Sequence, residues 1–252
     1  MDRLPSLAEE LVQLKVDVIV VTSTLTAQAA KRTTSTIPVV MTLVADPIGS
    51  GFVTNLAHPG GNVTGLSLMT TELNVKRLEL LKETMPKLAR VAVLSNPNMP
   101  YVPKTIEELK AAARSMSIEL SIATARTPEE FEAAFRTIRR ARAQALYLIE
   151  SPLFYGHRTT LAKLVVRARL PAIYGTRAFA DEGGLMSYGA SYEDLMRRCA
   201  GYVDKILRGA KPGDLPIEQP TKFEFVVNLR TAQALGLSIP QAVFLQADDV
   251  IK

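Results

Sequence analysis

Residues 91–94 read VAVL, and three similar apolar runs follow: IELSI at 118–122, ALYLI at 145–149 and AIY at 172–174. The runs begin at positions 91, 118, 145 and 172, so they recur at an equal interval. Each has the length and the β-branched or aromatic content of a buried strand. Most of the segments between them carry apolar residues at helical spacing, as in residues 131–138. This alternation predicts successive strand–helix units in one parallel sheet covered by helices.

The alternation extends toward the N-terminus through two further apolar runs, at 16–21 and 37–44. Gly- and Pro-rich stretches interrupt it at 46–70 and 181–189, and we interpret them as places where the chain crosses between two lobes. The expected division is residues 1–69 plus 188–222 for lobe 1 and residues 70–187 for lobe 2. The C-terminal strand–helix segment 223–252 is left without a lobe.

Composition and charge narrow the function classes. No apolar run reaches the roughly 18 residues that a membrane-spanning helix needs. The formal net charge is +5, but Lys and Arg are scattered along the chain, whereas a nucleic-acid interface gathers its basic residues on one face. We therefore expect no nucleic-acid partner.

Catalytic and metal-binding motifs are absent from the sequence. The two histidines, His58 and His157, have no Cys, His or carboxylate neighbours at metal-ligand spacing. Cys199 lies on an apolar helical stripe, which favours a buried thiol over a nucleophile. The Gly-rich segment 60–65 matches neither common phosphate-binding motif. We expect no enzymatic activity, no cofactor and no metal.

Polar residues that follow the predicted strands are the candidate ligand-binding groups, because parallel sheets bind ligands beyond the carboxyl ends of their strands. Hydroxyls, short amides, carboxylates and tyrosines suit a small polar molecule. Helix capping is the alternative role for about half of them, since Ser, Thr, Asn and Asp are the preferred N-caps. The predicted contacts are Ser23, Thr24, Asp46, Pro47, Thr70, Asn96, Glu150, Ser151, Tyr174 and Tyr188.

Several stretches together resemble a known family. They are LKVDVIV at 14–20, IPVVM through DPIGSG at 37–51, LAHPGGNVTGLS at 56–67, GGLMSYG at 183–189 and, in the tail, PTKFE at 220–224 with residues 228–237. The chain resembles the substrate-binding proteins of ABC transporters, in the branch with the type I periplasmic-binding fold that includes aromatic amino-acid binders.

The resemblance implies two Rossmann-like lobes with parallel sheets flanked by helices, joined by a hinge and closing over a solute in the cleft. It further implies a membrane permease as partner, an amino acid as a possible solute, and a periplasmic or lipid-anchored location. We expect a monomer. Two alternatives stay open, namely the ligand-sensing domain of a regulator or receptor and, less favoured, a small α/β enzyme.

One departure from the family pattern concerns the N-terminus. Family members begin with a secretion signal and a strand–helix–strand unit ahead of the helix expected at 4–14, and neither precedes this helix here. Since that first strand normally lies inside the sheet, its loss would leave an unpaired strand edge. We expect the chain to be a fragment or the product of a misplaced start.

Overall fold

The computed structural model describes residues 3–68 and 70–252, and the side chains of these residues except those at 70–72. The chain forms two compact units. Unit 1 comprises Met1–Thr70 and Ala190–Lys222, and unit 2 comprises Thr71–Gly189 and Phe223–Lys252. The chain therefore passes three times between the units, after residues 70, 189 and 222. The segment 223–252 packs with unit 2.

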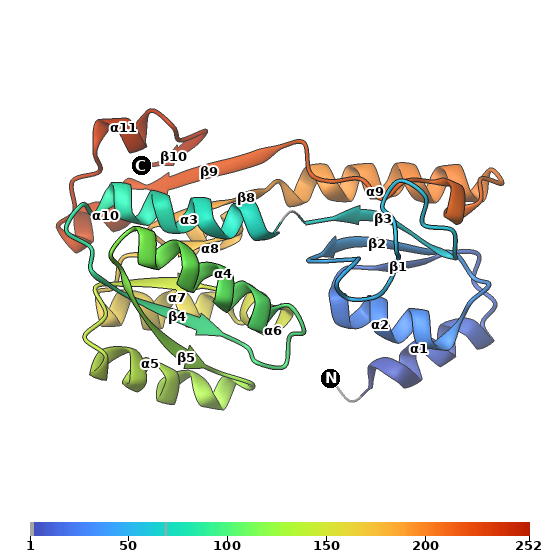
Figure 1. Cartoon of the computed structure of the whole chain (residues 1–252), viewed down its shortest axis with the longest axis horizontal. Helices are drawn as coiled ribbons and strands as arrows, with labels where there is room; N and C mark the ends of the chain where they lie inside the picture. The colour runs from blue at the N-terminus through green and yellow to red at the C-terminus, as the bar shows by residue number, and fades with distance from the viewer. Residues whose placement is uncertain (1–2, 69) are drawn as a thin grey trace. The chain divides into compact units, whose positions relative to one another are not determined.

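Unit 1 is built on a parallel sheet whose described strands lie in the order β1-β2-β3. The central strand β2 is apolar on both faces, as a strand between two helical layers must be. Helix α9 covers one face through Leu195 and Cys199, and α2 covers the other through Ala27 and Ala30 (Figure 1). The elements are α1 (Leu4–Gln13), β1 (Ile19–Val21), α2 (Thr24–Thr33), β2 (Val39–Val44), β3 (Val63–Ser67), α9 (Tyr192–Leu207) and the short η2 (Pro212–Asp214).

Strands β2 and β3 approach each other closely at one glycine. Gly65 on β3 is registered with Met41 on β2 and has a φ of 128°, in the region that glycine alone adopts readily. A Cβ at this position would lie 2.0 Å from the Met41 carbonyl oxygen. The Gly-rich segment 60–65 thus ends in a strand residue that must be glycine for steric reasons.

Unit 2 contains a larger sheet, with its described strands in the order β10-β9-β8-β7-β6-β4-β5. The pairs β4–β5, β4–β6, β6–β7, β7–β8 and β9–β10 are parallel. Its elements are α3 (Thr70–Thr84), β4 (Arg90–Ser95), α4 (Val102–Ser115), β5 (Glu119–Thr124), η1 (Pro128–Glu130), α5 (Phe131–Arg140), β6 (Ala145–Leu148), α6 (Pro152–Gly156), α7 (Arg158–Ala168), β7 (Ala172–Tyr174), α8 (Arg177–Asp181), β8 (Met186–Ala190), β9 (Phe223–Asn228), α10 (Leu229–Leu235), α11 (Gln241–Phe244) and β10 (Asp249–Ile251).

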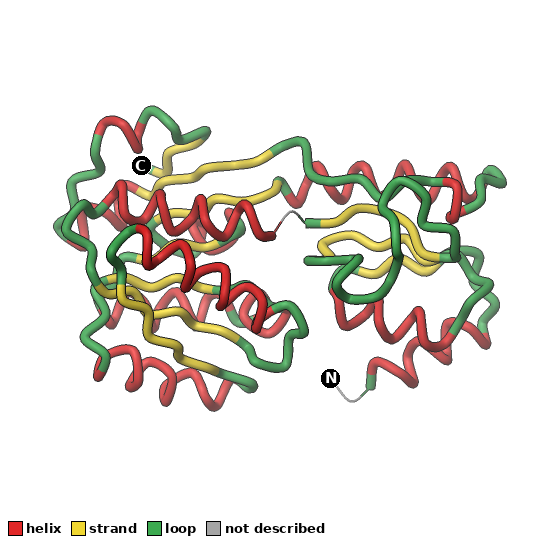
Figure 2. Tube along the Cα trace, viewed as in Figure 1, coloured by secondary structure: helices red, strands yellow, loops and turns green. Residues whose placement is uncertain are grey.

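The four equally spaced apolar runs become β4, β5, β6 and β7 of this sheet, with the regular alternation of strand and helix seen in Figure 2. Leu94 and Leu148 point into a core formed with Phe131 of α5 and Leu161 of α7. The predicted α/β class, with parallel sheets flanked by helices, is confirmed. Within the described part of the chain, no helix combines the length and the apolar character needed to cross a membrane.

Candidate functional site

In unit 1, the predicted residues after β1 are engaged in local structure. Ser23 is the N-cap of α2, where its hydroxyl accepts a hydrogen bond from the Thr26 N–H at 3.2 Å and the Thr26 hydroxyl accepts one from the Ser23 N–H at 3.1 Å. Thr24 is buried, and its hydroxyl accepts a bond from the Ala45 N–H at 3.5 Å. Ser23 thus acts as a helix cap, and the Thr24 hydroxyl links the start of α2 to the residue that follows β2.

The predicted residues after β2 form a turn. One carboxylate oxygen of Asp46 accepts a hydrogen bond from the Gly49 N–H at 2.8 Å, and the Pro47 carbonyl accepts one from the Phe52 N–H at 2.9 Å. A Cβ at Gly49 would lie 2.3 Å from the Asp46 carboxylate, so any larger residue there would displace this side chain. Thr70 is the first residue of α3, but its side chain lies outside the described residues.

In unit 2, the structure places two predicted residues at adjacent strand ends. Leu94 of β4 is registered with Leu148 of β6, so Asn96 and Glu150 leave neighbouring strands at the same level. Ser151, next along the chain, is the N-cap of α6 and accepts a hydrogen bond from the Phe154 N–H at 3.3 Å. This arrangement agrees with the strand-end reasoning from the sequence.

Several buried polar atoms near these strand ends have no hydrogen-bond partner in the part of the chain that the structure describes. The Asn96 side chain is fully buried, and its oxygen accepts a bond from the Asn98 N–H at 3.1 Å, but its amide nitrogen has no partner among the described residues. The hydroxyls of Ser95 on β4 and Ser187 on β8 are likewise buried and have no partner among the described residues. A buried polar group left unpaired costs about 1–3 kcal/mol, and native proteins retain such groups where a ligand or water completes the bonding.

The two predicted tyrosines differ in their surroundings. Tyr174 is completely buried, its ring stacks on Phe179 with centroids 4.5 Å apart, and burial raises the pKa of its hydroxyl. This ring belongs to the core. Tyr188 is half-buried, and its ring lies 6.4 Å from Phe223 and 6.2 Å from Phe225, centroid to centroid. Tyr188 and Phe223 thus present partly exposed aromatic surface.

Sequence reasoning missed a buried arginine on α3. The Arg77 side chain donates from Nε to the Tyr188 carbonyl at 2.6 Å and from Nη1 to the Asn74 side-chain oxygen at 3.1 Å. The same Asn74 oxygen accepts a bond from the Tyr147 hydroxyl at 2.8 Å. The available signal was the position of Arg77 directly beside the apolar stripe of a predicted helix. Because Arg is almost never buried without partners, this position indicates polar partners inside the unit.

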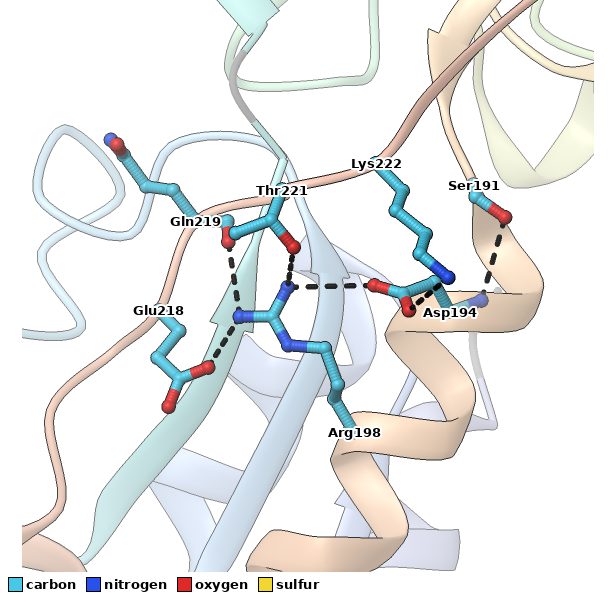
Figure 3. A network of polar contacts seen from close by, with 7 residues as sticks. All are labelled: Ser191, Asp194, Arg198, Glu218, Gln219, Thr221 and Lys222. Atoms are coloured by element: carbon cyan, nitrogen blue, oxygen red, sulfur yellow. Dashed lines mark hydrogen bonds and ion pairs between the residues drawn. The ribbon is translucent and has the colours of Figure 1, made fainter.

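A second polar network lies in unit 1 and joins the start and the end of its second part, Ala190–Lys222 (Figure 3). Arg198 on α9 pairs with Glu218 and donates to the Gln219 carbonyl at 3.2 Å, and its Nη1 lies 3.6 Å from the Asp194 carboxylate. The Arg198 guanidinium lowers the pKa of the Glu218 carboxyl, chiefly by hydrogen bonding. Nearby, the Ser191 N–H donates to the Lys222 carbonyl at 3.0 Å, so the segments around residues 191 and 222 are held together.

Comparison with known proteins gives a consistent result. A family model described as ABC transporter substrate binding protein matches residues 2–251. The chain is 29% identical, over 98% of its length and 72% of the relative's, to a tyrosine-binding protein of Clostridioides difficile (strain R20291).

Two solved structures extend the comparison. A conserved domain protein from Vibrio cholerae has a TM-score of 0.92 and 30% identity, with 98% of this chain and 82% of that one covered. An ABC domain from Streptococcus pneumonia in complex with L-Trp has a TM-score of 0.90 and 26% identity, with 99% and 84% covered.

Proposed function

Because the chain belongs to the ABC transporter substrate-binding protein family, we propose that it captures an amino acid, with aromatic amino acids as the first candidates, and delivers it unchanged to a membrane permease. Members of this family are extracytoplasmic. We place the protein in the periplasm or on a lipid anchor at the outer face of the cytoplasmic membrane, as a monomer. The related proteins named for tyrosine binding or solved with L-Trp support the choice of solute.

The observation that carries the proposal is the pair of polar groups at adjacent strand ends of unit 2. Asn96 supplies a buried amide donor that no described residue pairs with, and Glu150 supplies a carboxylate at the same level of the next strand. Neighbouring strands lie about 4.8 Å apart. An α-amino acid carries its carboxylate and ammonium groups on one carbon, closer together than the two strands, so side chains extending from both strand ends can reach them: the carboxylate can accept from Asn96 while the ammonium group pairs with Glu150.

The partly exposed rings of Tyr188 and Phe223 supply the apolar part of the proposed contact. An aromatic solute side chain can stack on such a surface in the offset or edge-to-face arrangements that aromatic pairs prefer. Ser151 flanks Glu150 as a further hydroxyl. The core position of Tyr174 gives it a supporting role beneath the surface. Ser23, Thr24, Asp46, Pro47 and Thr70 stay predicted contacts.

Thermal-shift screening against amino acids, organic acids and sugars, followed by calorimetric titration, tests the proposal. A ligand at about 100 times its Kd adds about 2.7 kcal/mol to the stability of the folded state. We expect L-tyrosine or L-tryptophan to stabilise the protein, and mass spectrometry to recover the solute unchanged. Stabilisation by another solute class with none by amino acids would contradict the assignment of the solute.

Variants locate the site. Asn96→Ala and Glu150→Gln should each weaken amino-acid binding by about tenfold or more, because each removes a polar partner of the solute. Asn98→Ala is the matched control, since Asn98 is exposed and contributes its backbone N–H, which the substitution retains. Equal affinities in all three variants would place the site elsewhere.

A further inference from the structure

Arg77 is held in a fixed orientation inside unit 2. Its side chain is 7% exposed, and two of its nitrogens donate to neutral acceptors, the Tyr188 carbonyl and the Asn74 side-chain oxygen. Asn74 is itself fixed by the Tyr147 hydroxyl. A guanidinium carries its donors in a rigid planar fork, so these two bonds determine where the third nitrogen, Nη2, points.

The third nitrogen points toward Glu150 across a glycine. A Cβ built on Gly175 would lie 2.6 Å from Arg77 Nη2 and 2.8 Å from Glu150 Oε2. The guanidinium and the carboxylate therefore meet in the space that Gly175 leaves open. The backbone of Glu150 is fixed separately, because its carbonyl accepts a hydrogen bond from the Tyr101 hydroxyl at 2.8 Å.

We infer that Arg77 is a positioning residue that orients the Glu150 carboxylate toward the ammonium group of the bound amino acid. This inference rests on the proposed function of Glu150. An ionised carboxylate has two oxygens and about four lone-pair sites, so it can accept from the guanidinium and from the solute together. Arg77 also compensates the Glu150 charge when no solute is bound, which keeps the carboxylate in place.

The test compares amino acids with their des-amino analogues by calorimetric titration. Arg77→Gln should weaken binding of L-tyrosine or L-tryptophan by about tenfold, and by no more than Glu150→Gln does, because its effect is exerted through the Glu150 carboxylate. It should change the affinity for 3-(4-hydroxyphenyl)propionate or indole-3-propionate by less than about threefold. Lys76→Gln is the control on the same helix, where Lys76 makes a surface ion pair with Glu83, and it should bind both ligand types like the wild type.

A double-variant cycle separates positioning from general structural support. If Arg77 acts through Glu150, the combined Arg77→Gln/Glu150→Gln variant should bind amino acids about as weakly as Glu150→Gln alone. Arg77→Lys should not restore affinity, since an ammonium cannot make three divergent bonds in one plane. Additive effects, or equal losses for amino acids and des-amino analogues, would refute the positioning role.

Gly175→Ala provides a second route if Arg77 variants do not fold. The added methyl displaces the flexible ends of Arg77 and Glu150 while retaining both charges, so amino-acid affinity should fall by about tenfold with the fold intact by circular dichroism. Unchanged affinity would overturn the inference. A wild-type protein that binds no amino acid would instead overturn the proposed function itself. Wild-type binding with a Glu150→Gln variant of equal affinity would overturn the Glu150 contact and the positioning role with it, while the capture of an amino acid would stand.

Discussion

Replacing Gly65 by alanine should strongly destabilise unit 1. Gly65 has a φ of 128°, and a residue with a Cβ held in such a conformation is strained by about 1–3 kcal/mol. The new Cβ would also lie 2.0 Å from the Met41 carbonyl oxygen and 2.7 Å from the Met41 nitrogen. Both are backbone atoms of β2, so they can move only if the β2–β3 register shifts, and overpacking of this kind costs about 1–3 kcal/mol.

The two costs have different origins, so the expected loss in the free energy of unfolding is about 2–6 kcal/mol. For a domain of the size of unit 1, each kcal/mol shifts the midpoint by about 4–8 °C, so the smallest expected decrease is roughly 8 °C. Urea denaturation and thermal scans measure the size of the effect. Hydrogen exchange should locate it in β2 and β3, and also at the Glu218 N–H, which donates to the Gly65 carbonyl at 3.0 Å.

Gly201→Ala is the matched control in the same unit. Gly201 lies inside α9, and a Cβ there meets no atom within 4 Å. Alanine is favoured over glycine in a helix interior by about 1 kcal/mol, so this substitution should raise stability. The same chemical change is thus expected to have opposite signs at two positions of unit 1. A Gly65→Ala variant as stable as the wild type would show that the strain and close-contact reasoning is wrong.

Two further predictions concern residues near the boundaries between the units, and one of them has a control substitution. Arg198→Met should lower the stability of unit 1 by about 1–3 kcal/mol at pH 7, whereas Arg197→Met, which removes only an exposed ion pair, should change it by less than about 0.5 kcal/mol in urea titrations. Arg198 lowers the pKa of the Glu218 carboxyl, so part of the stability difference between the wild type and Arg198→Met depends on the Glu218 charge. That part should be present above the usual carboxyl range and disappear as the pH falls through the lowered pKa. A stability difference unchanged at pH 3 would contradict this assignment. Gly189→Ala should destabilise unit 2 by about 1–3 kcal/mol, because its Cβ would lie 1.8 Å from the Gly175 carbonyl oxygen; a denaturation midpoint equal to that of the wild type would argue against this contact.

The sequence predicted four strands of unit 2 and the sheet edge at which its candidate site lies. Four apolar runs at equal intervals predict parallel strand–helix units, and parallel strands end on the same edge of their sheet. This reasoning placed Asn96 and Glu150 correctly after their strands. It could not separate a ligand contact from a cap, since Ser23 and Ser151 have the same residue type and position in either role.

The sequence by itself determined the α/β class and the strand ends, because these depend on local periodicity and on residues close together in the chain; the family was indicated by a resemblance in several short stretches. Only the tertiary structure decided which side chains near the strand ends are exposed to a ligand and which are buried in the core. A strand buried on both faces has no polar–apolar alternation, so nothing local shows that Tyr174 points into the core while Tyr188 stays partly exposed. The meeting of Arg77, Glu150 and Gly175 likewise joins three distant positions through packing, and helical spacing alone does not determine which strand ends a helix covers.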